Sequence, residues 1–122
     1  MRALIVDDSR SARGYLREML EERGIECEEA GDGQAGIDLL HAGRRFEVAL
    51  VDWNMPAMNG LEMLKQLRLR GCEGMKVIMV SGAAENEFIL RALDAGADEY
   101  LMKPFDEAAL GDKLVLLGLA EA

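Results

Sequence analysis

Short runs of apolar residues alternate along this chain with segments whose apolar residues recur at helical spacing, and this alternation constrains the fold most strongly. Solid apolar runs are typical of strands that are buried on both faces of a sheet. Five segments are predicted as strands: residues 3–6, 25–30, 48–51, 77–80 and 97–102. The second of these segments is more polar than the others, so we expect it to lie less centrally in the sheet.

Each predicted strand is followed by a predicted helix. The first helix begins after Ser9, a favourable N-cap residue, and ends at Gly24. The other four helices are centred on Ala35, Leu39 and Leu40; on Leu61, Leu64 and Leu67; on Phe88, Ile89, Ala92 and Leu93; and on residues 106–117. Five strands alternating with five helices predict an α/β fold with a doubly wound parallel sheet. The right-handed crossover rule leaves few topologies, among them the flavodoxin-like strand order 2-1-3-4-5.

The composition limits the partners and the location of the protein. The chain has 122 residues, of which 14 are basic and 23 acidic, and its formal net charge is −9. Phosphates would be repelled by such a chain, so direct nucleic-acid contact is not expected. No apolar run approaches the roughly 20 residues of a membrane span, and no signal-peptide pattern precedes the first strand. Cys27 and Cys72 lack CxxC spacing, and reduced thiols are typical of a cytoplasmic protein. We expect a single cytoplasmic domain over residues 1–122.

Reactive side chains follow four of the five predicted strands. Ligands bind beyond the carboxyl ends of the strands in an open parallel sheet. The side chains found there are Asp7 and Asp8 after the first strand, Asp52 after the third, Ser81 after the fourth and Lys103 after the fifth. Each signal alone is more often ordinary turn or capping chemistry. Their placement at four strand ends of one sheet favours a functional site.

The chemistry of these groups points to a divalent cation and an anionic ligand. Three neighbouring carboxylates repel one another unless a cation lies between them, and Mg²⁺ prefers such oxygen ligands. Lys103 offers a positive charge to an anion such as a phosphoryl group, and Ser81 can donate one hydrogen bond to it. An aspartate close to both Mg²⁺ and an ammonium group is suited to act as a carboxylate nucleophile.

The residues around these positions form motifs that resemble the CheY-like receiver domain of bacterial two-component response regulators. The resemblance extends from Leu4 to about Leu117. It is carried by Leu4-Ile5-Val6-Asp7-Asp8, by Val51-Asp52-Trp53-Asn54-Met55-Pro56 with Asn59-Gly60-Leu61-Glu62, by Val80-Ser81-Gly82-Ala83, and by Gly96-Ala97-Asp98-Glu99-Tyr100-Leu101-Met102-Lys103-Pro104-Phe105.

The resemblance implies a role for each acidic residue. Asp52 would be the phosphoacceptor, taking a phosphoryl group from a phosphohistidine of a sensor histidine kinase or phosphotransfer protein. The side chains of Asp8 and Asp52 and the main-chain carbonyl of Asn54 would ligate Mg²⁺. Asp7 would act mainly through a bound water.

The resemblance also implies a switch. Lys103 would pair with the phosphoryl oxygens, and the Lys103–Pro104 peptide bond would be cis to aim the lysine. Ser81 would hydrogen-bond the phosphoryl group, and Tyr100 would move from an outward to an inward rotamer. The face formed by the fourth helix, fifth strand and fifth helix would respond by changing its contacts with other proteins.

Three functional interpretations follow. The first is a receiver that stands alone as a signalling switch rather than an enzyme, as in chemotaxis or a phosphorelay. The second is the receiver portion of a longer regulator whose output domain is not in this chain; the ending Ala120-Glu121-Ala122, without a linker, favours the first. The third is a hydrolase that uses an aspartyl-phosphate intermediate.

The last helix is more apolar than one buried stripe requires, which makes it a candidate face for a partner or a dimer.

Overall fold

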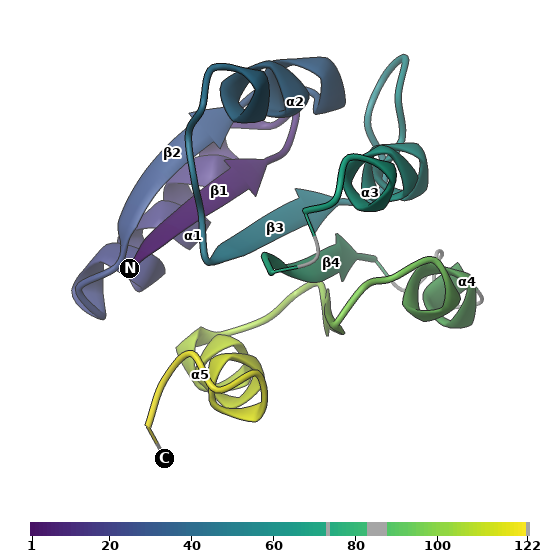
Figure 1. Cartoon of the computed structure of the whole chain (residues 1–122). Coiled ribbons are helices and arrows are strands. Elements are labelled where there is room, and N and C mark those ends of the chain that lie inside the picture. Colours follow the sequence, from purple (N-terminus) through teal and green to yellow (C-terminus); the bar gives the residue numbers. More distant parts are fainter. Residues whose placement is uncertain (73, 83–87, 122) are drawn as a thin grey trace.

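A five-stranded parallel sheet with helices on both faces forms the framework of the protein (Figure 1). This computed structural model describes residues 1–72, 74–82 and 88–121. The strand order is β2-β1-β3-β4-β5, which confirms the predicted flavodoxin-like α/β arrangement and places the polar second strand at an edge. The motif residue Ala83 lies outside the described residues.

All ten predicted elements are present. The strands are β1 (Arg2–Val6), β2 (Glu26–Ala30), β3 (Val48–Asp52), β4 (Lys76–Ser81) and β5 (Glu99–Met102). The helices are α1 (Arg10–Glu22), α2 (Gly33–His41), α3 (Gly60–Leu69), α4 (Ile89–Asp94) and α5 (Glu107–Leu116). No helix in the described part of the chain is long and apolar enough to cross a membrane.

The predicted bounds of the last two strands are wrong by one or two residues. Strand β5 begins at Glu99 rather than at residue 97, because the Ala97 N–H donates to the Ala92 carbonyl and thereby closes α4. Strand β4 extends to Ser81, whose carbonyl accepts a hydrogen bond of 2.7 Å from the Lys103 N–H. This bond holds the end of β4 beside the residue that follows β5.

Short polar side chains fix where four of the helices begin. Each of them accepts a hydrogen bond from a main-chain N–H in the first turn, which satisfies a donor that the helix itself leaves unpaired. These N-cap residues are Ser9 for α1, Asp32 for α2, Asn59 for α3 and Asp106 for α5. Because α1, α3 and α5 begin shortly after β1, β3 and β5, these caps also define the loops at the carboxyl edge of the sheet.

The sheet separates two hydrophobic cores. Along β1, Leu4 and Val6 pack toward α2, α3 and α4, whereas Ala3 and Ile5 pack toward α1 and α5. All four of these side chains are fully buried. A strand with both faces covered has a solid apolar run as its sequence, which explains why the central strands could be recognised from the residues alone.

Candidate functional site

Three carboxylates meet at the carboxyl edge of the sheet, as predicted. Asp7 and Asp8 directly follow β1, and Asp52 is the last residue of the neighbouring strand β3. One oxygen of each carboxylate can be chosen so that all three lie within 4.8 Å of one another. Asp7 and Asp52 are buried, whereas Asp8 is exposed. The cluster therefore contains two buried carboxylates and one carboxylate that is open to solvent.

Lys103 is the cation that faces this cluster. Its Nζ lies 2.9 Å from Oδ1 of Asp52 and 3.6 Å from Oδ2 of Asp7. The Lys103–Pro104 peptide bond is cis, as the resemblance implies. A single ammonium group among three carboxylates leaves an excess of negative charge at the site when all of them are ionised.

The pKa values of this pair follow from burial and from their mutual contact. Burial raises the pKa of Asp52 above its ordinary value, and the hydrogen bond from Lys103 only partly opposes this effect. Burial would lower the pKa of Lys103, but the hydrogen bond to Asp52 and the charges of Asp52 and Asp7 raise it. Lys103 is therefore protonated at neutral pH, and the ionised Asp52 gains stability from any additional cation.

The donor set suits a hard divalent ion. Mg²⁺ binds oxygen ligands, usually through one or two carboxylates together with water. The cluster offers three carboxylates with too little positive charge to balance them, and Asp8 leaves it open to solvent. Asn54, whose carbonyl is the fourth predicted ligand, is exposed in the loop that follows β3. These residues fit Mg²⁺ by charge, ligand type and access.

Ser81 provides a buried hydroxyl at the same edge of the sheet. It is the last residue of β4, and in the sheet register it follows the residue paired with Asp52. Ser81 is 3% exposed, and its Oγ has no hydrogen-bond partner among the described residues. A buried hydroxyl without a partner costs free energy, so a phosphoryl oxygen that accepted its hydrogen bond would be stabilised by it.

Tyr100 lies on β5, where this strand meets α5. The Nζ of Lys113 lies 4.4 Å from the centre of its ring, and the same ammonium pairs with Glu99 at 3.0 Å. The ring is half-buried. Tyr100 is therefore held against α5 by a cation–π contact in this state.

An aromatic stack joins the loop after β3 to the start of α4. The rings of Trp53 and Phe88 are stacked, with 5.4 Å between their centres and 15° between their planes. The guanidinium of Arg91 lies 5.3 Å from the centre of the Phe88 ring. No sequence pattern indicates this contact, because its members are far apart in the chain. Trp53 is thus placed to report on both Asp52 and α4.

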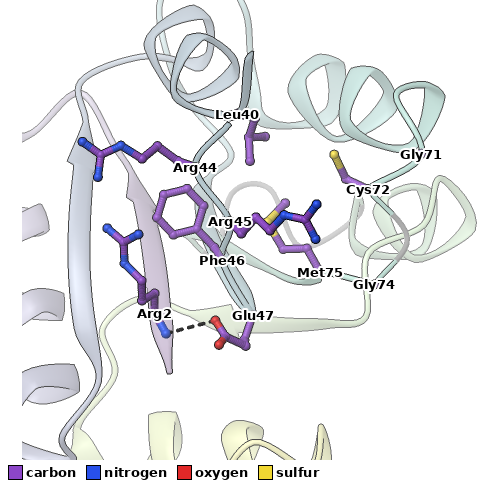
Figure 2. Close-up of a pocket in the computed structure, with 10 residues that line it drawn as sticks. All are labelled: Arg2, Leu40, Arg44, Arg45, Phe46, Glu47, Gly71, Cys72, Gly74 and Met75. Atoms are coloured by element: carbon purple, nitrogen blue, oxygen red, sulfur yellow. Dashed lines mark hydrogen bonds between the residues drawn. The ribbon is translucent and has the colours of Figure 1, made fainter. Parts of the chain in front are cut away.

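A separate pocket of about 780 Å³ lies away from the carboxylates, at the amino-terminal end of the central strands (Figure 2). It is lined by Arg2, Leu40, Arg44, Arg45, Phe46, Glu47, Gly71, Cys72, Gly74 and Met75. Arg2 and Arg44 pair with Glu28 at 3.0 and 3.3 Å, and the Arg2 N–H donates to Glu47. Glutamates already engage two of its three arginines, and none of the predicted site residues lies in it.

Comparisons with known proteins find relatives over most of the chain. The response regulator receiver domain family matches residues 3–115. Chemotaxis protein CheY-3 of Vibrio cholerae is 36% identical over 116 residues, which cover 93% of this chain and 88% of that protein. Chemotaxis protein CheY of Pseudomonas aeruginosa is 34% identical over 116 residues, which cover 93% of each chain.

Solved structures show the same fold. A CheY-like receiver domain protein from Methanospirillum hungatei has a TM-score of 0.84 and 38% identity, and the match covers 95% of this chain and 91% of that one. Chemotaxis protein CheY4 of Vibrio cholerae has a TM-score of 0.86 and 31% identity, covering 94% and 96% of the two chains. A probable response regulator/GGDEF domain protein, with a TM-score of 0.89 and 26% identity, is matched over 98% of this chain and 50% of its own length.

Proposed function

Because this chain belongs to the response regulator receiver domain family, we propose that Asp52 accepts a phosphoryl group from a phosphohistidine of a sensor histidine kinase or phosphotransfer protein. One observation carries this proposal. Asp52 is a buried carboxylate that accepts a 2.9 Å hydrogen bond from Lys103 and is grouped with Asp7 and Asp8. This is the only acidic cluster of three in the described residues that could hold a metal ion.

Mg²⁺ is the cofactor that we assign to this cluster. The side chains of Asp8 and Asp52 and the main-chain carbonyl of Asn54 would hold it, and Asp7 would contribute mainly through a water. When bound, Mg²⁺ would offset negative charge on the transferring phosphoryl group. The excess of carboxylates over ammonium groups at the site supports this assignment.

Asp52 and Lys103 supply the attacking group and a fixed positive charge for the reaction. The Asp52 carboxylate attacks phosphorus, and a P–O bond forms as the P–N bond of the phosphohistidine breaks and the histidine nitrogen keeps the electron pair. Lys103 remains protonated because of its contacts with Asp52 and Asp7, so it supplies a fixed positive charge for the phosphoryl oxygens. The Ser81 carbonyl, which accepts a hydrogen bond from the Lys103 N–H, supports the position of this residue beside the end of β4.

The conformational switch that follows phosphorylation would involve the Ser81 hydroxyl and the Tyr100 ring. The Ser81 hydroxyl, which has no partner among the described residues, would donate to the new phosphoryl oxygens. Tyr100 would leave Lys113 for an inward rotamer, and the face made by α4, β5 and α5 would change. A two-state surface biased in this way acts through protein contacts, either with a separate target or with an output domain.

We further propose that the protein is a cytoplasmic signalling switch, as in chemotaxis or a phosphorelay, rather than a hydrolase. Its net charge of −9 argues against direct nucleic-acid contact by this domain. Many cycles of phosphate monoester hydrolysis per Asp52 would contradict the switch and support the hydrolase alternative.

Trp53 fluorescence tests the proposed function, because this residue follows Asp52 and stacks on Phe88. Mg²⁺ is added first, and then acetyl phosphate as a small phosphodonor. Each addition should change the fluorescence. The Asp52→Asn variant should fold but show no response to acetyl phosphate, whereas Asp112→Asn, at an exposed position on α5, should respond like the wild type. An unchanged response in Asp52→Asn would refute the assignment of the phosphoacceptor.

A further inference from the structure

An arginine on α1 contacts the peptide that links the two acidic residues after β1. The Nη1 of Arg13 donates a hydrogen bond of 2.7 Å to the main-chain carbonyl of Asp7. This carbonyl belongs to the peptide group between Asp7 and Asp8. The Arg13 side chain is 17% exposed, and its Nε pairs with Glu29 on β2 at 2.9 Å. The guanidinium is thus held between the edge strand and the acidic loop.

The position of Asp8 depends on this peptide. Asp8 is exposed, and its side chain has no hydrogen bond or ion pair with any described residue. The loop around it is held by the Asp7 N–H, which donates to the Ala30 carbonyl at 3.1 Å, and by Oδ1 of Asp7, which accepts from the Ser9 N–H at 2.8 Å. Arg13 adds the contact that fixes the carbonyl of the Asp7–Asp8 peptide, and hence the direction in which the chain enters Asp8.

Glu29 neutralises the charge that Arg13 brings to this loop. It pairs with both Arg13 at 2.9 Å and Arg17 at 2.7 Å, and Arg17 also pairs with Glu21 at 3.4 Å, so two carboxylates balance the two guanidinium groups. The hydrogen bond from Arg17, above all, lowers the pKa of Glu29, so this carboxylate is ionised at neutral pH. Arg13 can therefore orient the acidic loop without adding an uncompensated positive charge that would repel a cation.

We propose that Arg13 is a positioning residue of the metal site: it holds the Asp7–Asp8 peptide so that the Asp8 carboxylate meets those of Asp7 and Asp52. This inference rests on the proposed Mg²⁺ site. Groups that orient metal ligands without touching the metal commonly change its affinity by about 10- to 100-fold when they are removed.

Arg17 offers a matched control. It lies one turn further along α1 and pairs with the same glutamate, but its other contacts are with the Cys27 carbonyl at 3.1 Å and with Glu21 at 3.4 Å rather than with the acidic loop. Arg13→Met and Arg17→Met both remove one guanidinium from Glu29. A loss of stability alone would therefore affect both variants, whereas a loss of ligand positioning would affect only Arg13→Met.

The experiment is a titration with Mg²⁺ alone, followed by Trp53 fluorescence, on the wild type and both variants. Arg13→Met should bind Mg²⁺ about 10-fold more weakly, and Arg17→Met should stay within about twofold of the wild type. In the metal-free protein, the ¹⁵N resonance of the Asp8 amide should shift in Arg13→Met and not in Arg17→Met, because the hydrogen bond polarises the Asp7–Asp8 peptide. If Arg13→Met does not fold, Arg13→Lys carries the same test, since a lysine cannot keep both contacts.

Equal Mg²⁺ affinity in the wild type and the Arg13 variant would overturn the positioning role while leaving the proposed function intact. A similar loss of affinity in both arginine variants would also overturn it, because the effect would then follow from the shared contact with Glu29. Absence of Mg²⁺ binding in the wild type would overturn both the metal site and this inference.

Discussion

Ser81 should make the protein less stable than it would be with alanine at the same position. Its hydroxyl is buried at the end of β4 and has no hydrogen-bond partner among the described residues. An unsatisfied buried polar group costs about 1–3 kcal/mol, and the void left by one oxygen costs only a few tenths of a kcal/mol. Ser81→Ala should therefore raise the free energy of unfolding by about 1 kcal/mol, or the melting temperature by about 3–5 °C for a domain of this size.

The assay is urea unfolding of the metal-free protein, followed by circular dichroism. Ser9→Ala provides a control with the same chemical change, because the Ser9 hydroxyl caps α1 by accepting from the Ala12 N–H at 3.2 Å. That variant should lose about 1 kcal/mol. The two serines are thus expected to respond with opposite signs.

The same Ser81 variant should impair the switch. Ser81→Ala should still accept a phosphoryl group on Asp52, but the following change in Trp53 fluorescence should be reduced, since the phosphoryl oxygens lose a donor.

A Ser81→Ala variant that is less stable than the wild type would show that the hydroxyl is satisfied in the resting protein, and would refute the reasoning.

Three further predictions concern the scaffold around the site. Arg68→Met should lower the free energy of unfolding by about 3 kcal/mol, since the guanidinium donates to the carbonyls of three residues in two loops and pairs with Asp98 at 2.9 Å. Gly60→Ala should cost about 2 kcal/mol or more and weaken Mg²⁺ binding, because a Cβ at this position would lie 2.5 Å from the Asp52 carbonyl oxygen. In Glu29→Gln, the free energy of unfolding should fall less steeply than in the wild type as the pH is lowered below 4.5. The pKa of Glu29 is lowered below 4.5, chiefly by Arg17, so the ionised carboxylate contributes its full stability above pH 4.5, and this contribution is lost as the pH falls through the lowered value.

Each of these predictions has a control or a result that would contradict it. Arg70→Met, at an exposed position just after α3, should change the stability by less than about 0.5 kcal/mol. Gly14→Ala, in an open position inside α1, should stabilise the protein by about 0.5–1 kcal/mol. Equal changes in stability for Arg68→Met and Arg70→Met, or for Gly60→Ala and Gly14→Ala, would contradict the structural reasons given. For Glu29→Gln, the contradicting result is a difference in stability from the wild type that grows as the pH falls below 4.5.

The amino-acid sequence was sufficient to predict the sheet and the residues at its carboxyl edge. Parallel strands buried on both faces have solid apolar runs, and this pattern located β1, β3 and β4 within two residues at either end. Because parallel strands end at the same edge, the residues after them could be grouped from their positions in the chain. The meeting of Asp7, Asp8 and Asp52 within 4.8 Å confirms that grouping.

The supporting contacts could not be predicted in the same way, because they have no periodicity. Arg68 donates to carbonyls of residues 72, 75 and 96, and this choice depends on how two loops approach α3. The contact between Arg13 and the Asp7 carbonyl depends on the orientation of one peptide group. The stack of Trp53 on Phe88 joins residues from opposite sides of β4 in the sequence. Long polar and aromatic side chains reach such partners only once the backbone fold is fixed.

The central claim is that Asp52 is the phosphoacceptor, and mass spectrometry tests it most directly. The wild type and Asp52→Asn are incubated with Mg²⁺ and acetyl phosphate, their intact masses are measured, and the modified peptide is sequenced by fragmentation. We predict that the wild type gains one phosphoryl group on Asp52, that the gain requires Mg²⁺, and that Asp52→Asn gains none. A phosphoryl group on another residue of the wild type, or an equal gain in Asp52→Asn, would contradict the account.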